Sequence, residues 1–201
     1  GFEGPPGQEN SENVVIWANQ WEPSTKVQHA SQIYATRWNL TCDSNDSEIF
    51  IGANEILVNK DISIINEYDV PEHDLLCGGF PCQDYSVAKT LDKSKGLEGK
   101  KGVLWWEISR IIKLRKPPYV LLENVDRLLK SPTTQRGRDY AIMLATFAEL
   151  DYTVEWRVVN AADYGYAQRR RRVFIFAWKN NTDWGKKFKK NKNPEEWLSD
   201  E

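Results

Sequence analysis

The sequence predicts a doubly wound α/β fold with a mostly parallel sheet, because short apolar runs alternate with helical patterns along the chain. The composition agrees: 40% of the 201 residues are hydrophobic and 28% are charged, as in globular proteins. A chain of this length supports one domain of this kind and leaves no room for two complete ones.

Four features are expected in the first half of the chain. Residues 14–18 form a short apolar run with β-branched side chains, which predicts a buried strand. A helical pattern follows from Pro23 to about residue 38, and residues 74–77 predict a strand that runs into Gly78-Gly79. Residues 80–102 lack periodicity, and so long a loop in a compact domain is usually functional.

The second half continues the alternation. An apolar stripe at i, i+4, i+7 and i+8 starts at Leu104 and predicts a helix that ends before Pro117-Pro118. The next elements are a strand at 119–122 that is apolar throughout, a helix at 140–150, and strands at 152–159 and 173–177. Residues 179–201 are polar and lysine-rich, and no core face is expected there. In doubly wound sheets ligands bind where strands end, which directs attention to the segments after Ala18, Cys77 and Leu122.

Charge is distributed unevenly along the chain. The formal net charge is −2, but residues 1–84 carry −11, residues 85–164 carry +4 and residues 165–201 carry +5. A polyanion responds to a local field, so near-neutrality of the whole chain does not exclude nucleic-acid binding. Ordinary solvated faces are the simpler explanation of charge alone.

Cysteine, histidine and apolar content exclude several kinds of site. Three cysteines without metal-ligand spacing fit a reducing compartment, and two histidines are too few for a histidine-based metal centre. No metal is therefore expected. No apolar run reaches the roughly 18 residues of a membrane span, so no membrane association is expected either.

Three short motifs hold residue types suited to catalysis. Cys82 follows a strand end between Pro81 and a long polar loop, the position of a nucleophile, whereas Cys77 lies within the apolar strand and is expected to be buried and inert. Glu123 ends the strand at 119–122, where an acid is either a surface residue or a proton donor with a raised pKa. The run 169–172 contains four arginines, suited to phosphates and carbonyl groups but equally typical of a solvated patch.

Taken in order, these motifs resemble those of the cytosine carbon-5 DNA methyltransferases. Pro81-Cys82-Gln83, Glu123-Asn124-Val125 and the segment 168–172 match three signature motifs, and the likeness extends over residues 17–177. The resemblance implies a Rossmann-like domain that uses S-adenosylmethionine, with double-stranded DNA as partner and base flipping to expose the cytosine. The catalytic and DNA-contacting residues that it implies are Cys82 as nucleophile, Glu123 at ring nitrogen 3, Arg172 at the base carbonyl, and Gln83, Ser86 and Arg170 on DNA.

The resemblance also assigns a cofactor site. Trp21 is similar to the adenine-stacking tryptophan of the family, and Gln20 stands where the family usually has an acid for the ribose hydroxyls. Asp61 and Ile62 match the segment that contacts the adenine amino group. Phe80 and Leu104 would form walls of the site, and core packing is a second role for Leu104.

Domain limits and context follow from the same resemblance. Residues 1–178 are expected to be the catalytic domain without its first strand and glycine turn, incomplete at both ends, and 179–201 a tail or the start of a target-recognition region. A second subunit or a further segment would carry that region. A bacterial restriction–modification role in the cytoplasm or at the nucleoid is implied. An RNA cytosine-5 methyltransferase and a non-catalytic DNA- or cofactor-binding fragment remain the alternatives.

Overall fold

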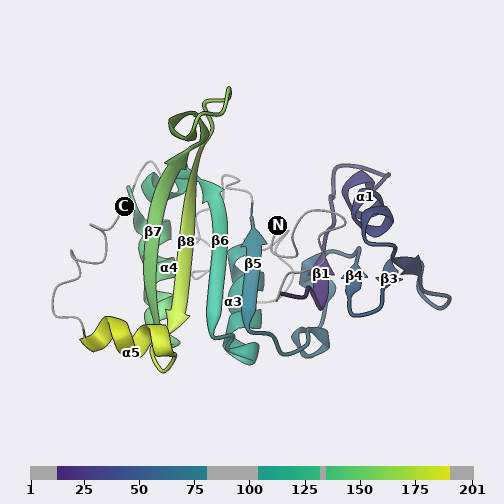
Figure 1. Cartoon of the computed structure of the whole chain (residues 1–201), viewed down its shortest axis with the longest axis horizontal. Coiled ribbons are helices and arrows are strands. Elements are labelled where there is room, and N and C mark those ends of the chain that lie inside the picture. The colour runs from purple at the N-terminus through teal and green to yellow at the C-terminus, as the bar shows by residue number, and fades with distance from the viewer. Residues whose placement is uncertain (1–12, 81–103, 132–134, 191–201) are drawn as a thin grey trace. The chain divides into compact units, whose positions relative to one another are not determined.

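The computed structural model describes residues 13–80, 104–131 and 135–190. The chain divides into two compact units, Gly1–Pro71 and Glu72–Glu201, and each has a sheet of its own (Figure 1). Within the described ranges, no helix has the length and apolar character needed to cross a membrane.

The first unit holds a four-stranded mixed sheet in the order β1-β4-β3-β2. Strands β1 and β4 are parallel, whereas β3 is antiparallel to both of its neighbours, because short turns connect β2 to β3 and β3 to β4. The elements are β1 (Trp17–Asn19), α1 (His29–Arg37), β2 (Thr41–Cys42), β3 (Ile49–Ile51), β4 (Ile56–Val58), and the 3-10 helices η1 (Ile62–Ile64) and η2 (Glu67–Asp69).

Helix α1 begins later than the sequence predicts. The segment after Pro23 is a turn, in which the Gln28 side-chain amide donates hydrogen bonds to the carbonyl oxygens of Glu22 and Thr25. The Gln28 side-chain oxygen accepts one from the backbone amide of Glu22. These bonds hold the backbone of the turn in a non-helical arrangement, so the helix starts only at His29.

The second unit holds a four-stranded sheet in the order β5-β6-β8-β7, with helices α3 and α4 behind it in the view of Figure 1. Its four strands are the ones that the sequence predicts. Both predicted helices also form, and their ends lie within two residues of the expected positions. The elements are β5 (Leu75–Gly79), α3 (Leu104–Arg115), β6 (Tyr119–Val125), η3 (Asp126–Lys130), α4 (Arg138–Glu149), β7 (Tyr152–Asn160), η4 (Ala161–Tyr164), β8 (Arg171–Lys179) and α5 (Asp183–Lys190).

The core of this unit lies between the sheet and the two helices. Val120 and Leu122 of β6 alternate with half-buried residues, so one face of the strand is fully buried. Trp105 of α3 is fully buried, and its ring lies 5.4 Å from that of Phe147 on α4. This core fixes the carboxyl end of β6, which carries the candidate acid.

The prediction of a mostly parallel sheet is wrong for the part of the chain that the structure describes. In the second unit β5 and β6 are parallel, but β8 runs antiparallel to both β6 and β7. Only ten residues, 161–170, separate β7 from β8, and a parallel crossover needs a dozen or more. The alternation of strands and helices earlier in the chain suggested parallel strands throughout, but β7 and β8 form a hairpin.

The expectation that the last segment has no core face is also wrong for residues 183–190. They form α5, and the rings of Trp184 and Phe188 lie 6.3 and 5.5 Å from that of Trp178. The spacing i, i+4 puts both rings on one side of the helix. Two aromatic residues among lysines therefore pack this helix against Trp178 of β8.

Candidate active site

Glu123 and Arg172 form the centre of the candidate site. Glu123 lies near the end of β6 and Arg172 near the start of β8, and the antiparallel register pairs Val125 with Arg172. The Arg172 Nε atom lies 2.8 Å from Glu123 Oε1. The side chains are 23% and 37% exposed, so the pair is in contact with solvent yet partly desolvated. Two motifs 49 positions apart in the sequence thus meet through strand pairing.

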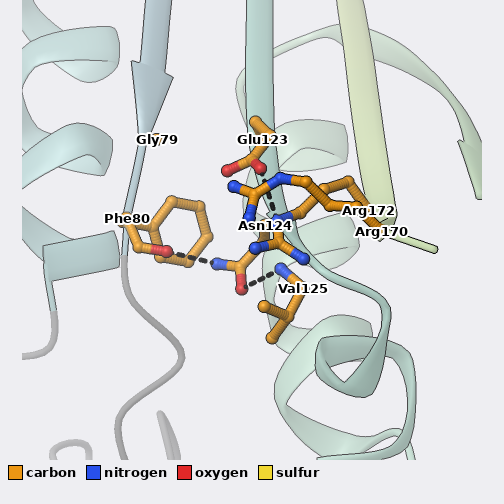
Figure 2. A pocket seen from close by; sticks show the side chains of 7 residues that line it. All are labelled: Gly79, Phe80, Glu123, Asn124, Val125, Arg170 and Arg172. Carbon is orange, nitrogen blue, oxygen red and sulfur yellow. Dashed lines mark hydrogen bonds and ion pairs between the residues drawn. The ribbon is translucent and has the colours of Figure 1, made fainter. Parts of the chain in front are cut away.

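Asn124 connects this centre to the segment that leads to Cys82. Its side chain is 1% exposed, and its amide donates a hydrogen bond of 2.8 Å to the carbonyl oxygen of Phe80. The Asn124 side-chain oxygen accepts one of 2.8 Å from the backbone amide of Val125 (Figure 2). The sequence places Asn124 within a motif but assigns it no role. Only the structure shows that Asn124 is buried beside the charged Glu123, and this burial reveals its structural role.

The predicted nucleophile and two predicted DNA contacts cannot be placed. Cys82, Gln83 and Ser86 lie outside the residues that the structure describes. Phe80 is the last described residue before them, and it is 7% exposed, with its ring 6.4 Å from that of Trp105. The start of the predicted catalytic loop is therefore anchored in the core.

A pocket of ≈ 260 Å³ opens beside the Glu123–Arg172 pair. Figure 2 shows the side chains of Glu123, Arg172 and Arg170 converging on it. Arg170, predicted to contact DNA, is exposed, and no ion pair of its guanidinium is found in the described ranges. The pocket is lined by Gly79, Phe80, Glu123, Asn124, Val125, Arg170 and Arg172. It combines one carboxylate, two guanidinium groups and an apolar wall, which suits a small planar polar ring.

Gly79 is a second residue whose position the sequence did not anticipate. It pairs with Glu123 in the parallel β5–β6 ladder, so both lie on one face of the sheet. A Cβ atom at Gly79 would lie 3.5 Å from Glu123 Oε2, in ordinary contact. Any larger side chain would extend from there beside the carboxylate, so the glycine keeps this wall of the pocket open.

Arg171 differs from its neighbour in the run. Its Nε atom lies 3.0 Å from Asp126 Oδ2, at the start of η3, and the two side chains are 53% and 37% exposed. Successive residues of a strand point to opposite faces, so Arg171 and Arg172 engage different acids. Two of the four arginines are thus balanced by carboxylates.

The predicted cofactor residues of the first unit lie at one edge of its sheet. Gln20 and Trp21 follow β1, and Asp61 and Ile62 follow β4. Because β1 and β4 are parallel neighbours, their carboxyl ends meet: the backbone amide of Gln20 donates a hydrogen bond of 3.2 Å to the carbonyl oxygen of Val58.

Hydrogen bonds inside this edge fix the two strand ends. The Asn19 side chain donates to the carbonyl oxygens of Val58 and Lys60, each over 2.9 Å. The buried Ser31 hydroxyl of α1 lies 2.9 Å from the Gln20 carbonyl oxygen and 2.8 Å from Asn59 Oδ1. Asp61 caps η1 by accepting from the backbone amide and the hydroxyl of Ser63. These bonds fix the backbone next to Trp21, whose side chain is half-buried.

Phe80 and Leu104, the predicted walls of the cofactor site, belong to the second unit. Phe80 is part of its buried core, and Leu104 is half-buried against the same core. The structure therefore gives both a packing role. A group of three or more potential metal ligands is not found among the described residues.

Cys77 differs from the expectation of a buried cysteine. It is exposed, because it pairs with Leu121 on the face of the sheet opposite the buried Val120 and Leu122. Neighbouring atoms nevertheless desolvate the thiol, and this raises its pKa above the ordinary value. The thiol is thus accessible but poorly ionised at neutral pH, which still favours an inert role.

Comparison with known proteins agrees with the geometry. A family model described as C-5 cytosine-specific DNA methylase matches residues 7–200. The type II methyltransferase M.Sau3AI of Staphylococcus aureus is 53% identical over 185 residues, which cover 90% of this chain and 42% of that protein. M.HhaI of Haemophilus parahaemolyticus is 38% identical over 121 residues, 60% of this chain and 35% of that protein.

The chain thus spans less than half the length of these relatives. Among solved structures, the Spodoptera frugiperda DNMT2 E260A/E261A/K263A mutant superposes with a TM-score of 0.60 at 16% identity, covering 86% of this chain and 45% of that one. That likeness shows a shared fold. The family model over nearly the whole sequence shows more: this chain belongs to the C-5 cytosine-specific DNA methylase family.

Proposed function

We propose that the protein carrying this chain transfers a methyl group from S-adenosylmethionine to carbon 5 of a cytosine in double-stranded DNA. The observation that carries the proposal is the pair of Glu123 and Arg172, 2.8 Å apart in a pocket beside the anchored residue Phe80. Two positions after Phe80 the sequence places Cys82. Acid, cation and nucleophile are the three groups that activation of a cytosine ring requires.

Each group has a distinct chemical task. Carbon 5 of cytosine is a poor nucleophile, so Cys82 as a thiolate would first form a bond to carbon 6. Glu123 would hold a proton at ring nitrogen 3 and prevent negative charge from accumulating on the ring. Arg172 would donate to the ring carbonyl oxygen. After carbon 5 has gained the methyl group, a base removes its proton and the bond from Cys82 to carbon 6 breaks.

The pocket suits an extruded base. A cytosine in a duplex cannot reach a carboxylate at a strand end, so the base must be flipped out, which costs a few kcal/mol. The pocket of ≈ 260 Å³ is slightly smaller than the roughly 300 Å³ at which sites for drug-sized ligands begin. Its size and its polar groups therefore match a single base. Gln83, Ser86 and Arg170 are proposed to contact the DNA.

The residues at the β1–β4 edge fit the cofactor. The parallel register brings Gln20 and Trp21 to the same edge as Asp61 and Ile62, so one adenosine group can contact both strand ends. We propose that Trp21 stacks on the adenine, Gln20 bonds the ribose, and Asp61 and Ile62 contact the adenine amino group. When bound, S-adenosylmethionine supplies the methyl group.

The remaining context is proposed on the same basis. Residues 1–178 would act as one catalytic domain, and 179–201 as a tail or as the start of a target-recognition region. Because the chain spans less than half of its relatives, a further segment or a second subunit would supply target recognition. The type II relatives from bacteria favour a role in restriction–modification, in the cytoplasm or at the nucleoid.

Covalent trapping tests the proposal. The natural gene product that carries this sequence is incubated with S-adenosylmethionine and a DNA duplex containing 5-fluorocytosine, which blocks proton removal from carbon 5. We expect an adduct that denaturing gel electrophoresis resolves, that Cys82→Ser abolishes and that Cys42→Ser retains. RNA of the same sequence should give no adduct. Absence of the adduct on all duplexes of a randomised library would refute the reaction, and an adduct on RNA alone would favour an RNA methyltransferase.

A further inference from the structure

The turn between β7 and β8 exposes two aromatic rings outside the pocket. Residues 161–170 connect the strands, and in Figure 1 this end of the hairpin extends past the neighbouring end of β6. Tyr164 is 62% exposed and Tyr166 is 71% exposed. Tyrosine is enriched at interfaces because its ring offers apolar area and its hydroxyl a polar contact. Two such rings separated by one residue require an explanation that core packing does not give.

The backbone of this turn is held by its own hydrogen bonds. The Ala161 amide donates to the Arg170 carbonyl oxygen over 3.0 Å, and the Tyr166 amide donates to the Ala161 carbonyl oxygen over 3.2 Å. Gly165, between the two tyrosines, has a φ of 83°, in the left-handed region that glycine adopts without strain. The rings are therefore presented from a defined backbone, which lowers the entropy lost on binding.

Positive charge accompanies the rings. Of the four consecutive arginines that close the turn, Arg172 is paired with Glu123 and Arg171 with Asp126. For Arg169 and Arg170 no ion pair is found within the described part of the chain, and both are exposed. Asp163, the acid within the turn, accepts a hydrogen bond from the Asn160 amide. The turn thus presents two exposed rings together with two exposed arginines that have no ion pair among the described residues.

We propose that the turn 161–170 is a DNA contact surface, on which Arg169 and Arg170 neutralise phosphates while Tyr164 and Tyr166 pack against sugars and unstacked bases. A partner that is both polyanionic and rich in planar rings complements this combination of charge and aromatic area. Arg170 also lines the pocket. A DNA strand whose extruded cytosine enters the pocket would therefore pass the turn. The inference rests on the proposed function and extends it to residues beyond the pocket.

Equilibrium binding of the natural gene product to a fluorescent duplex with a one-nucleotide gap tests the rings. Fluorescence anisotropy should show that the double variant Y164A/Y166A binds at least about fivefold more weakly, since a stacked ring contributes about 1 kcal/mol or more. Y164F/Y166F should retain most of the affinity, because it keeps both rings. Tyr68→Ala, at a tyrosine that is 68% exposed in the first unit, is the matched control and should change nothing.

Salt dependence separates the charges from the rings. Removal of two phosphate contacts in R169A/R170A should reduce the slope of log affinity against log salt by about 2. The tyrosine variants should lower affinity at every salt concentration and leave that slope unchanged. This pattern distinguishes ring packing from a general loss of charge or of structure.

Several outcomes would overturn the inference, and they differ from those that refute the reaction. If Y164A/Y166A binds the gapped duplex like the wild type, the surface is misassigned even when the Cys82 adduct forms normally. If the tyrosine variants change self-association but not DNA affinity, the rings belong to a protein interface and the proposal is wrong. If they weaken binding while no adduct ever forms, the surface stands and the methyltransferase reaction fails.

Discussion

The side-chain amide of Asn124 donates a hydrogen bond of 2.8 Å to the carbonyl oxygen of Phe80, which ties the end of β6 to the residue that follows β5. Asn124 is almost fully buried, whereas its neighbour Glu123, which pairs with Arg172, is 37% exposed. Glu123, which forms the ion pair, and Asn124, which forms the buried hydrogen bonds, are thus consecutive residues of one strand. This arrangement lets the acid face the pocket while its strand is fixed to Phe80, where the predicted catalytic loop starts.

Asn124→Ala should therefore destabilise the second unit. It leaves the Phe80 carbonyl and the Val125 amide without their side-chain partner, and an unsatisfied buried group costs about 1–3 kcal/mol. Urea unfolding followed by tryptophan fluorescence measures this loss. The exposed Asn54→Ala is the matched control, with an expected change within about 0.5 kcal/mol. Equal stability of Asn124→Ala and wild type would contradict the structural role.

Arg172→Ala and Arg171→Ala should separate two neighbouring arginines. Arg172 faces the pocket, so its loss should slow formation of the 5-fluorocytosine adduct by about 100-fold or more, as for other groups that stabilise charge during reaction. Arg171 pairs with Asp126 at the surface, where an ion pair contributes about 0–1 kcal/mol.

Rapid-quench measurement of adduct formation checks this difference. Arg171→Ala should react within about threefold of the wild type, because its pair lies away from the lining of the pocket and contributes little. If both variants were slowed equally, the reaction would depend on the total positive charge of residues 169–172 and not on the position of Arg172.

Gly79→Val should close the pocket while Gly79→Ala is tolerated. A Cβ atom at this position lies in ordinary contact with Glu123 Oε2, but the methyl groups of valine would extend into the space beside it. Overpacking costs about 1–3 kcal/mol, so adduct formation should fall by about 5- to 150-fold for valine. The comparison is made at saturating S-adenosylmethionine, with thermal unfolding as the control for folding. Retained activity in Gly79→Val would place the base elsewhere.

Ser31→Ala should weaken cofactor binding without direct contact to the cofactor. The Ser31 hydroxyl lies within hydrogen-bond distance of both Gln20 and Asn59, so its loss frees the edge that presents Gln20 and Trp21. Isothermal titration with S-adenosylhomocysteine should show an affinity lower by about two- to tenfold, as expected for one hydrogen bond of about 0.5–1.5 kcal/mol. The exposed Ser47→Ala serves as control. Unchanged affinity in Ser31→Ala would separate this network from the cofactor site.

Cys77 should react with iodoacetamide only at alkaline pH. Desolvation raises the pKa of its thiol above the ordinary value, and the thiolate is the reactive form, so the rate should rise with pH and reach half its maximum at a higher pH than in the urea-unfolded protein. In the variant C42S/C82S, Cys77 is the remaining cysteine of this sequence, and mass spectrometry of the peptide that contains it follows the reaction. A midpoint in the folded protein at or below that of the unfolded protein would show that its neighbours stabilise the thiolate.

The sequence predicted most elements of the second unit because their patterns are local. The stripe that starts at Leu104 repeats at the period of a helix, and Pro117-Pro118 ends it. The uninterrupted apolar run at 119–122 identified the start of β6, which the structure extends to Val125. Motif order and spacing identified the family and predicted Cys82, Glu123 and Arg172 as its catalytic residues, since these features are present in the sequence itself.

Strand pairing and burial were decided only by the tertiary structure. The short connection limits β7 and β8 to an antiparallel pair, but no local pattern predicts that β8 inserts between β6 and β7. This insertion brings Arg172 within 2.8 Å of Glu123. The same register sends Arg171 to Asp126 and leaves Arg169 and Arg170 without an ion pair in the described ranges.

The sequence by itself therefore determined which chemical groups this protein possesses and to which family it belongs. The tertiary structure decided how those groups are used: it placed Asn124 as a buried tie, opened the wall at Gly79, and exposed Tyr164 and Tyr166. The physical reason is that side-chain chemistry is local, whereas ion pairing, desolvation and exposure depend on contacts between residues far apart in the chain.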